Sequence, residues 1–327
     1  MTEDIDFKEF FENRTELSDK DEYAHNFEEK VGHFPRYHNE SWYFNFIDRP
    51  NNVYFVTRLS LHMDTKKSRI LCISIIDGKK DVYFNEIPLD KLPENWELDK
   101  KVQYYCIKPM NQWRIKFKGK KFFLDVTING RFPVVNFGDY EDFNTIIEKY
   151  GEEFLHVAAQ EHYEQPTIVT GRLELKKGGK IYETRNIKGL GHRDHSWGIR
   201  HWVEINAWNW ASAQFEDMTI NLYKRYLKSI TPQMGVIYSK GNDIAIIENI
   251  EVTTKTREDG KTPVSSTFIL TDKNGNKKIL ESKTISSVYL FVPSKKGKTE
   301  VYEQVVVFTC DGKEGDGISE YLISEHD

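Results

Sequence analysis

The sequence predicts an all-β protein made of two successive antiparallel halves of about 120 and 160 residues. Runs rich in β-branched and aromatic residues recur from Ser41 almost to the C-terminus. Turn sequences such as Asn129-Gly130 and Asp311-Gly312 separate these runs, and both dipeptides are strong hairpin signals. Almost no helical pattern lies between the runs. Alternating strand–helix folds are therefore excluded, and antiparallel barrels or sandwiches are favoured.

Residues 1–34 predict a short N-terminal helical segment. Phe7, Phe10 and Phe11 follow a spacing closer to that of a helix than to that of a strand. The first residues are acidic, whereas a signal peptide would begin basic and then turn apolar, and no run of about 18 apolar residues occurs. We therefore expect a cytoplasmic protein without an integral membrane segment.

The remaining chain divides into a first half at 35–138, a connector at 139–165 and a second half at 166–327. The connector has apolar residues at helical spacing and predicts a helical or irregular link. Predicted strands of the first half are 42–47, 53–61, 69–76, 102–107, 113–117 and 122–128. Those of the second half are 167–175, 181–186, 202–215, 219–226, 234–239, 244–253, 265–271, 278–292 and 300–309.

Composition excludes several classes of partner and cofactor. The net charge of −5 gives no overall attraction to phosphate backbones, so nucleic acid is an unexpected partner. Three widely separated cysteines lack the spacing of a zinc site and predict reduced core residues. No phosphate-binding glycine loop and no serine-hydrolase Gly-x-Ser-x-Gly motif occurs. We expect no cofactor.

The stretch Gly189-Leu-Gly-His-Arg-Asp-His-Ser-Trp-Gly-Ile-Arg-His-Trp202 is the candidate site. Arg193, Asp194 and His195 place a cation, a carboxylate and an imidazole side by side, which suits either a buried ion network or a proton-transfer site. In a regular strand Asp194 would face away from Arg193 and His195. The flanking glycines leave open whether this stretch forms a regular strand. An apolar setting would raise the pKa of Asp194, whereas a close arginine would lower it.

Further residues are candidates for ligand binding. Trp202, Trp208 and Trp210 share one face if the strand is regular, where they would line a pocket or pack in a barrel core. Histidines of the candidate stretch match no zinc signature, so no metal site is predicted. The full set of ligand-binding candidates is His192, Trp197, Arg200, Trp202, Trp208, Trp210, Glu164, Glu320 and Tyr321.

Three motifs together resemble the carotenoid-hydratase/AttH-like family: Glu40-Ser-Trp-Tyr-Phe-Asn-Phe-Ile-Asp48, the candidate stretch Gly189–Trp202, and Gly317-Ile-Ser-Glu-Tyr-Leu322. The resemblance spans roughly residues 35–325. It implies two tandem lipocalin-like (calycin) β-barrels packed together, with a pocket for an apolar, often isoprenoid, molecule. Characterised relatives include hydratases that add water to a terminal C=C bond of acyclic carotenoids, and related barrels act as cyclases or isomerases.

The leading hypothesis is a cofactor-independent hydratase, lyase, isomerase or terpenoid cyclase, with its hydrophobic substrate at the junction of the barrels. Asp194 would deliver the proton, and His195 would accept a proton or hold water. Arg193 is the third predicted catalytic residue and is adjacent to them in sequence. Tryptophan rings would stabilise a cation. Two alternatives stay open: a non-catalytic carrier of a lipid or pigment, and a structural barrel without a cavity. The sequence leaves the oligomeric state open.

Overall fold

The structure is a computed structural model that describes residues 16–140, 147–148, 151, 160–202, 205–227, 230–294 and 297–326. The chain forms two compact units that meet in sequence between Arg200 and His201. Most of the predicted connector and the phenylalanines of residues 1–15 lie outside the described residues. The predicted all-β architecture is confirmed. The named helices of the described residues are three short ones, η1 (Asp19–Glu22), α2 (Phe27–Val31) and η2 (Phe137–Tyr140). No described helix is both long and apolar enough to cross a bilayer.

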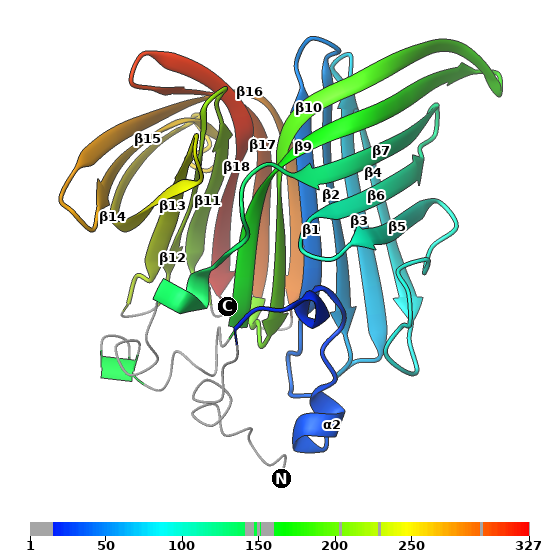
Figure 1. Ribbon diagram of the computed structural model, residues 1–327, viewed down its shortest axis with the longest axis horizontal. Coiled ribbons are helices and arrows are strands. Elements are labelled where there is room, and N and C mark those ends of the chain that lie inside the picture. The colour runs from blue at the N-terminus through cyan, green and yellow to red at the C-terminus, as the bar shows by residue number, and fades with distance from the viewer. Residues whose placement is uncertain are drawn as a thin grey trace. The chain divides into compact units, whose positions relative to one another are not determined.

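The first unit is one curled antiparallel sheet (Figure 1). Its main path runs β4-β3-β2-β1-β10-β9-β7-β6-β5, and β8 pairs with β9. The strands are β1 (Glu40–Asp48), β2 (Val53–His62), β3 (Lys67–Ile76), β4 (Lys79–Pro88), β5 (Val102–Lys108), β6 (Gln112–Lys118), β7 (Phe122–Gly130), β8 (Val135–Asn136), β9 (Gln160–Lys177) and β10 (Lys180–Gly198).

The boundary placed at residue 166 is wrong, because β9 and β10 belong to the first unit. Strand β10 pairs with β1, and β9 pairs with β7, so this hairpin lies between two meanders that precede it in the chain. The prediction grouped these two strands with the strands that follow them in the sequence, because neighbouring strands along a chain often pair. Here the long β9–β10 ladder instead completes the centre of the earlier sheet.

The expected first barrel is instead an open sheet with β4 and β5 at its edges. Side-chain contacts of the intervening segment link these edges. The Asp99 carboxylate accepts hydrogen bonds from Tyr83 (2.9 Å) and Asn85 (2.7 Å) on β4 and from the Val102 amide on β5. Trp96 packs on Trp42 in the core, with ring centroids 4.3 Å apart. The segment between β4 and β5 therefore connects the two edges of the sheet through side-chain contacts, where a closed barrel would have hydrogen bonds between the edge strands.

The second unit is a closed eight-stranded barrel in which β18 returns to β11 (Figure 1). Its interior holds an apolar cluster that includes Ala211, Leu222, Phe268 and Phe308. The strands are β11 (Ala207–Gln214), β12 (Met218–Tyr226), β13 (Gln233–Ser239), β14 (Asp243–Thr256), β15 (Pro263–Asp272), β16 (Lys277–Ser294), β17 (Gly297–Cys310) and β18 (Lys313–His326).

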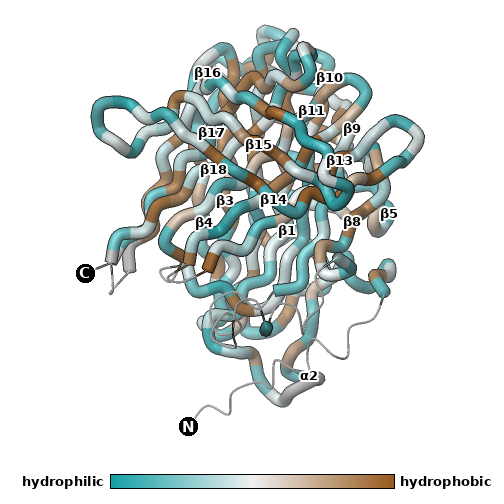
Figure 2. Tube along the Cα trace, turned by 90° about the vertical axis from the view of Figure 1, so that its left-hand side faces the viewer, coloured by the Kyte–Doolittle hydropathy of each residue, from teal (hydrophilic) through white to brown (hydrophobic). Residues whose placement is uncertain are grey.

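Alternation along the strands gives each sheet two different faces, and apolar and polar segments alternate along the chain trace (Figure 2). In β1, Trp42 and Phe44 point into the main core of the first unit. We call this side of β1, β10 and β9 the core face and the other side the reverse face. Gly191 of β10 allows close approach to β1, since a Cβ there would lie 2.0 Å from the Asn45 carbonyl oxygen.

Candidate functional site

Strand β10 carries most of the candidate stretch as a regular strand, so the three predicted catalytic residues do not form one site. Arg193 lies opposite Phe44 on β1 and Gln165 on β9, on the core face. Asp194 lies opposite Tyr43 and Glu164, on the reverse face. The hypothesis that groups Asp194 with Arg193 and His195 therefore requires correction, because alternate residues of a strand project to opposite sides.

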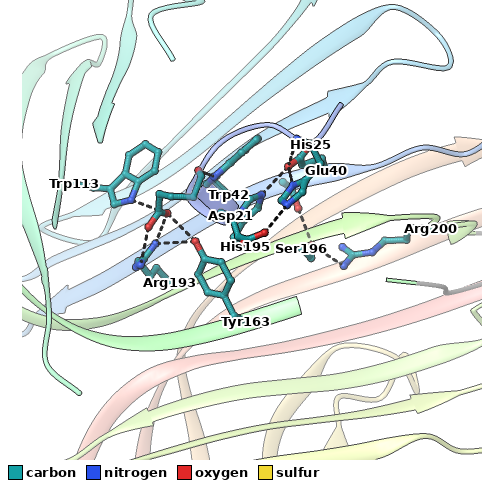
Figure 3. Close-up of polar contacts among 12 residues, drawn as sticks. Asp21, His25, Glu40, Trp42, Trp113, Tyr163, Arg193, His195, Ser196 and Arg200 are labelled. Atoms are coloured by element: carbon teal, nitrogen blue, oxygen red, sulfur yellow. Dashed lines mark hydrogen bonds and ion pairs between the residues drawn. The ribbon is translucent and has the colours of Figure 1, made fainter. Parts of the chain in front are cut away.

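On the core face, Arg193 pairs with Glu22 of η1. Figure 3 shows Arg193 near Tyr163 and Trp113, which contact the same carboxylate. Nη1 and Nη2 of Arg193 donate to Glu22 Oε1 at 2.7 Å and Oε2 at 3.2 Å. Tyr163 Oη and Trp113 Nε1 donate to the same Oε1 at 2.8 and 3.0 Å. Burial by itself would raise the pKa of Glu22, but Arg193 outweighs burial and holds this pKa below its usual value. Arg193 thus has a structural partner 171 residues away.

His195 belongs to a second group on the core face (Figure 3). Its Nε2 lies 3.0 Å from Glu40 Oε1, and its Nδ1 lies 2.9 Å from the Asp21 carbonyl oxygen. His25 Nδ1 lies 2.7 Å from the same Glu40 oxygen. The His25 ring stacks on Trp197 with centroids 4.1 Å apart, which places this predicted ligand-binding residue in the same group. The contacts fasten the N-terminal segment to the sheet.

This second group predicts that stability falls as the pH rises from 6.5 to 9. Burial would lower the pKa of His25, but Glu40 and Asp21 outweigh burial and raise it to about 9. A raised histidine pKa stabilises fully below the unfolded value of 6.5, and this contribution is lost as the pH passes 9. The shift corresponds to about 3 kcal/mol at most. Urea unfolding across this range measures the loss, and His25→Gln is expected to flatten the profile. A wild-type profile as flat as that of the variant would contradict the expectation.

The reverse face carries what we call the carboxyl–histidine cluster: His162, Glu164, His192 and Asp194. Glu164 is fully buried between the two histidines. Its Oε2 lies 2.5 Å from His192 Nε2, and its Oε1 lies 2.9 Å from His162 Nε2. Asp194 is the cross-strand neighbour of Glu164 and is only partly buried. Ligand atoms of His162, Glu164 and Asp194 all lie within 4.8 Å of one another.

The two carboxyl groups of the cluster have opposite pKa shifts. Burial, reinforced by the negative charge of Glu164, raises the pKa of Asp194 to about 7, although His162, Arg200 and Arg58 act in the other direction. Burial also opposes ionisation of Glu164, but His192 and His162 outweigh it and lower that pKa to about 2. Near pH 7 a substantial fraction of Asp194 is therefore protonated while Glu164 is a carboxylate, a pairing that acid–base sites use.

Two groups of described residues contain enough nitrogen and oxygen atoms to hold a metal ion. They are His25 with Glu40 and His195, and His162 with Glu164 and Asp194. In the first group the ring nitrogens already contact Glu40, Asp21 or the Asp21 backbone. The second group offers one histidine, His162, and two carboxylates, Glu164 and Asp194, and both types of side chain can bind zinc.

The predicted ligand-binding residues of the second unit lie partly on the outside of the barrel. Strand β11 begins at Ala207, so Trp202 precedes it, and its ring packs on that of Trp208 with centroids 5.2 Å apart. Ala211 and Ala213 belong to the interior cluster. Alternation therefore turns Trp208 and Trp210 outward, so of the two expected placements, a pocket lining or a barrel core, packing in the barrel core is wrong for these two residues. Glu320 lies opposite Trp210, and Tyr321 lies opposite Asn209 on the inner side.

Some residues of these polar contacts were predicted from the sequence, and others were missed. Glu164, His192 and Arg200 were predicted, and Arg200 donates from Nε to Gln160 at 2.7 Å and from Nη2 to Ser196 at 3.3 Å. Arg58 was missed, although a single arginine in the apolar run 53–61 was a usable signal. Glu22 and His25 carried no signal, because they lie in a polar segment far from their partners in sequence.

Comparison with solved structures shows that the fold of the chain is similar to that of AttH-like all-β proteins. A crystal structure of a protein assigned as AttH from Nitrosomonas europaea matches 91% of this chain and 96% of its own, with TM-score 0.63 and 14% identity. CghA matches with TM-score 0.61 and 11% identity, covering 89% of both chains. Kievitone hydratase from Nectria haematococca matches with TM-score 0.60 and 10% identity, covering 95% of this chain and 96% of its own.

The chain belongs to the family described as Domain of unknown function (DUF7064), whose model matches residues 18–324. A search of curated proteins finds no match by sequence. The predicted resemblance to AttH-like proteins is confirmed at the level of the fold.

Proposed function

We propose that the protein is a cofactor-independent acid–base enzyme that converts a hydrophobic small molecule at the carboxyl–histidine cluster. The observation that carries the proposal is the pairing of Asp194 with Glu164 on adjacent strands, with their pKa values shifted in opposite directions. Sites that move protons at neutral pH are built from such pairs. Kinship in fold with kievitone hydratase supports a reaction of the hydratase type.

Asp194 is the proton donor in this proposal. The residue is partly buried, and its pKa of about 7 keeps a substantial fraction protonated near neutral pH. Protonation of a C=C bond uses this proton and leaves a carbocation on the substrate and a carboxylate on Asp194. Asp194 performs the acid role assigned from the sequence, whereas His195 does not share its face.

Asp194 also takes up the proton that the reaction releases. Attack of water on the cation forms the new C–O bond and releases one proton, which the Asp194 carboxylate accepts, because its pKa of about 7 makes it a stronger base than Glu164 with a pKa of about 2. This step returns Asp194 to its acid form, and Glu164 stays ionised with its ligand atoms within 4.8 Å of those of Asp194. His192 and His162 hold the Glu164 oxygens at 2.5 and 2.9 Å and so fix its orientation. Net addition is one water molecule per turnover.

The test is organic extraction of protein purified from its own host, followed by mass spectrometry of the extract. An enzyme of this type is expected to yield a compound that purified protein converts to a product 18 Da heavier or lighter, or to an isomer of equal mass if protonation leads to cyclisation. A bound compound that fresh protein leaves chemically unchanged would instead identify a carrier and contradict the proposal.

A further inference from the structure

The carboxylate of Glu22 is surrounded by a complete set of donors from the sheet of the first unit. Oε1 accepts from Arg193, Tyr163 and Trp113 at 2.7, 2.8 and 3.0 Å. Oε2 accepts from Arg193 Nη2 at 3.2 Å and from the Met110 amide at 2.5 Å. Both oxygens are thus fully engaged, and Glu22 has no exposed surface.

These donors are held in position by contacts that do not involve Glu22. Arg193 Nε donates to Gln165 Oε1 at 2.7 Å. Gln165 Nε2 in turn donates to the carbonyl oxygens of Met110 and Phe132 at 3.1 and 3.0 Å. Tyr163 and Arg193 are fixed in neighbouring strands of the sheet. The donor set is therefore preorganised, and such a set binds a matching anion without further ordering.

Glu22 reaches this donor set from a short segment of which several residues are exposed. We call residues 18–25 the strap. It contains the four-residue helix η1, and Asp19, Lys20 and Tyr23 within it are exposed. Besides the Glu22 carboxylate, its polar anchors include the Asp21 carbonyl oxygen, 2.9 Å from His195 Nδ1, the Glu22 carbonyl oxygen, which accepts from Trp42 Nε1 at 3.0 Å, and the contact of His25 with Glu40. Exchange of Glu22 for another carboxylate therefore loosens these contacts as well, and it is expected only at high carboxylate concentration.

We propose that the donors around Glu22 form a binding site for a small monocarboxylate, which the strap occupies with its own Glu22 as an internal ligand. A free carboxylate and the strap then compete for Arg193. The site lies on the core face, opposite the carboxyl–histidine cluster, so the inference does not depend on the proposed acid–base function. Tethering gives Glu22 a high effective concentration, and the wild-type site therefore exchanges only with abundant carboxylate.

Glu22→Ala in the full-length protein tests the proposal by chemical rescue. The substitution removes a CH2–COO⁻ group, whose closest free equivalent is acetate. Thermal unfolding in sodium acetate is expected to show a saturable rise in Tm above that in sodium chloride at equal ionic strength. Acetamide, which has the same shape without the charge, is expected to give no rise. Glu22→Gly, which lacks one more carbon, is expected to respond better to propionate than to acetate.

Matched controls separate the site from a general salt effect. Asp19→Ala removes an exposed carboxylate from the same short helix and is expected to show no acetate-specific rise. If Glu22→Ala is unfolded in sodium chloride, circular dichroism can instead test whether sodium acetate refolds it, which is the expected result. A response of Glu22→Ala no larger than that of Asp19→Ala, or a response to acetamide equal to that to acetate, would overturn the proposal.

Hydrogen exchange of the wild-type protein tests the competition itself. Propionate well above the rescue midpoint is expected to speed exchange at the Asp21 and Tyr23 amides, which bond within η1. The Gly32 amide, which bonds to Glu28 at the end of α2, serves as the internal reference. Unchanged exchange at Asp21 and Tyr23 at such concentrations would show that the strap does not exchange with free ligand.

Discussion

Asp194→Asn is expected to reduce turnover by about 100- to 10,000-fold, because an amide cannot deliver the proton that starts the reaction. Asparagine has the shape of a protonated aspartate, so the fold is expected to tolerate it. Ionised Asp194 is unfavourable in its setting, since burial and Glu164 raise its pKa to about 7. The Tm of the variant at pH 8 is therefore expected to equal or exceed that of the wild type.

The pH profile of the same reaction gives an independent check. Activity requires protonated Asp194 and is expected to fall as the pH rises through about 7. Glu164→Gln removes the neighbouring charge that helps to raise this pKa, so any residual activity is expected to decline at a lower pH. Asp243→Asn, at an exposed site on β14, is the matched control and should retain both rate and profile. Full activity of Asp194→Asn would contradict the assignment.

Arg193→Ala is expected to lower the free energy of unfolding by about 3–5 kcal/mol, because it leaves the Glu22 carboxylate buried without its countercharge. For a chain of this size the loss corresponds to a decrease in Tm of roughly 4–7 °C. Urea or thermal unfolding measures it. Arg200→Ala, two positions beyond the end of β10, is the comparison, since Arg200 Nε and Nη2 donate to Gln160 and Ser196 and do not contact Glu22.

Comparison of Arg193→Ala with Asp194→Asn separates the two faces of β10. The account predicts a stability defect for the first and an activity defect for the second, although the residues are adjacent in sequence. A double variant in which Glu22→Gln accompanies Arg193→Met is expected to recover part of the lost stability, because it removes both charges. Equal stability of wild type and Arg193→Ala would contradict a structural role for this ion pair.

Much of the strand pattern could be predicted because β-branched and aromatic runs report local preference. The predicted strand 53–61 corresponds to β2 (Val53–His62), and 69–76 falls within β3 (Lys67–Ile76). Strand β4 was missed because its residues alternate between exposed and half-buried positions and begin with two lysines. The candidate stretch itself was left as an uncertain strand, since its glycines weaken the pattern while the β1 backbone requires them.

Pairing order and the partners of the charged residues could not be predicted, because both depend on contacts distant in sequence. Nothing local places the β9–β10 hairpin between β1 and β7. The direction of the Asp194 pKa shift was open for the same reason, since it required knowing that Arg193 faces away and Glu164 lies across the strand. The sequence thus suggested Asp194 as a candidate acid, and the fold shows that Glu164 is its cross-strand neighbour.

Whether Asp194 carries a proton near neutral pH is decided most directly by carbon-13 NMR of protein labelled at the aspartate side-chain carboxyl. The account predicts one resonance, absent from Asp194→Asn, that titrates with a midpoint near 7. In Glu164→Gln that midpoint is expected to move to lower pH. A midpoint at or below the ordinary value of 3.8 would mean that Asp194 is ionised under working conditions and is not the proton donor.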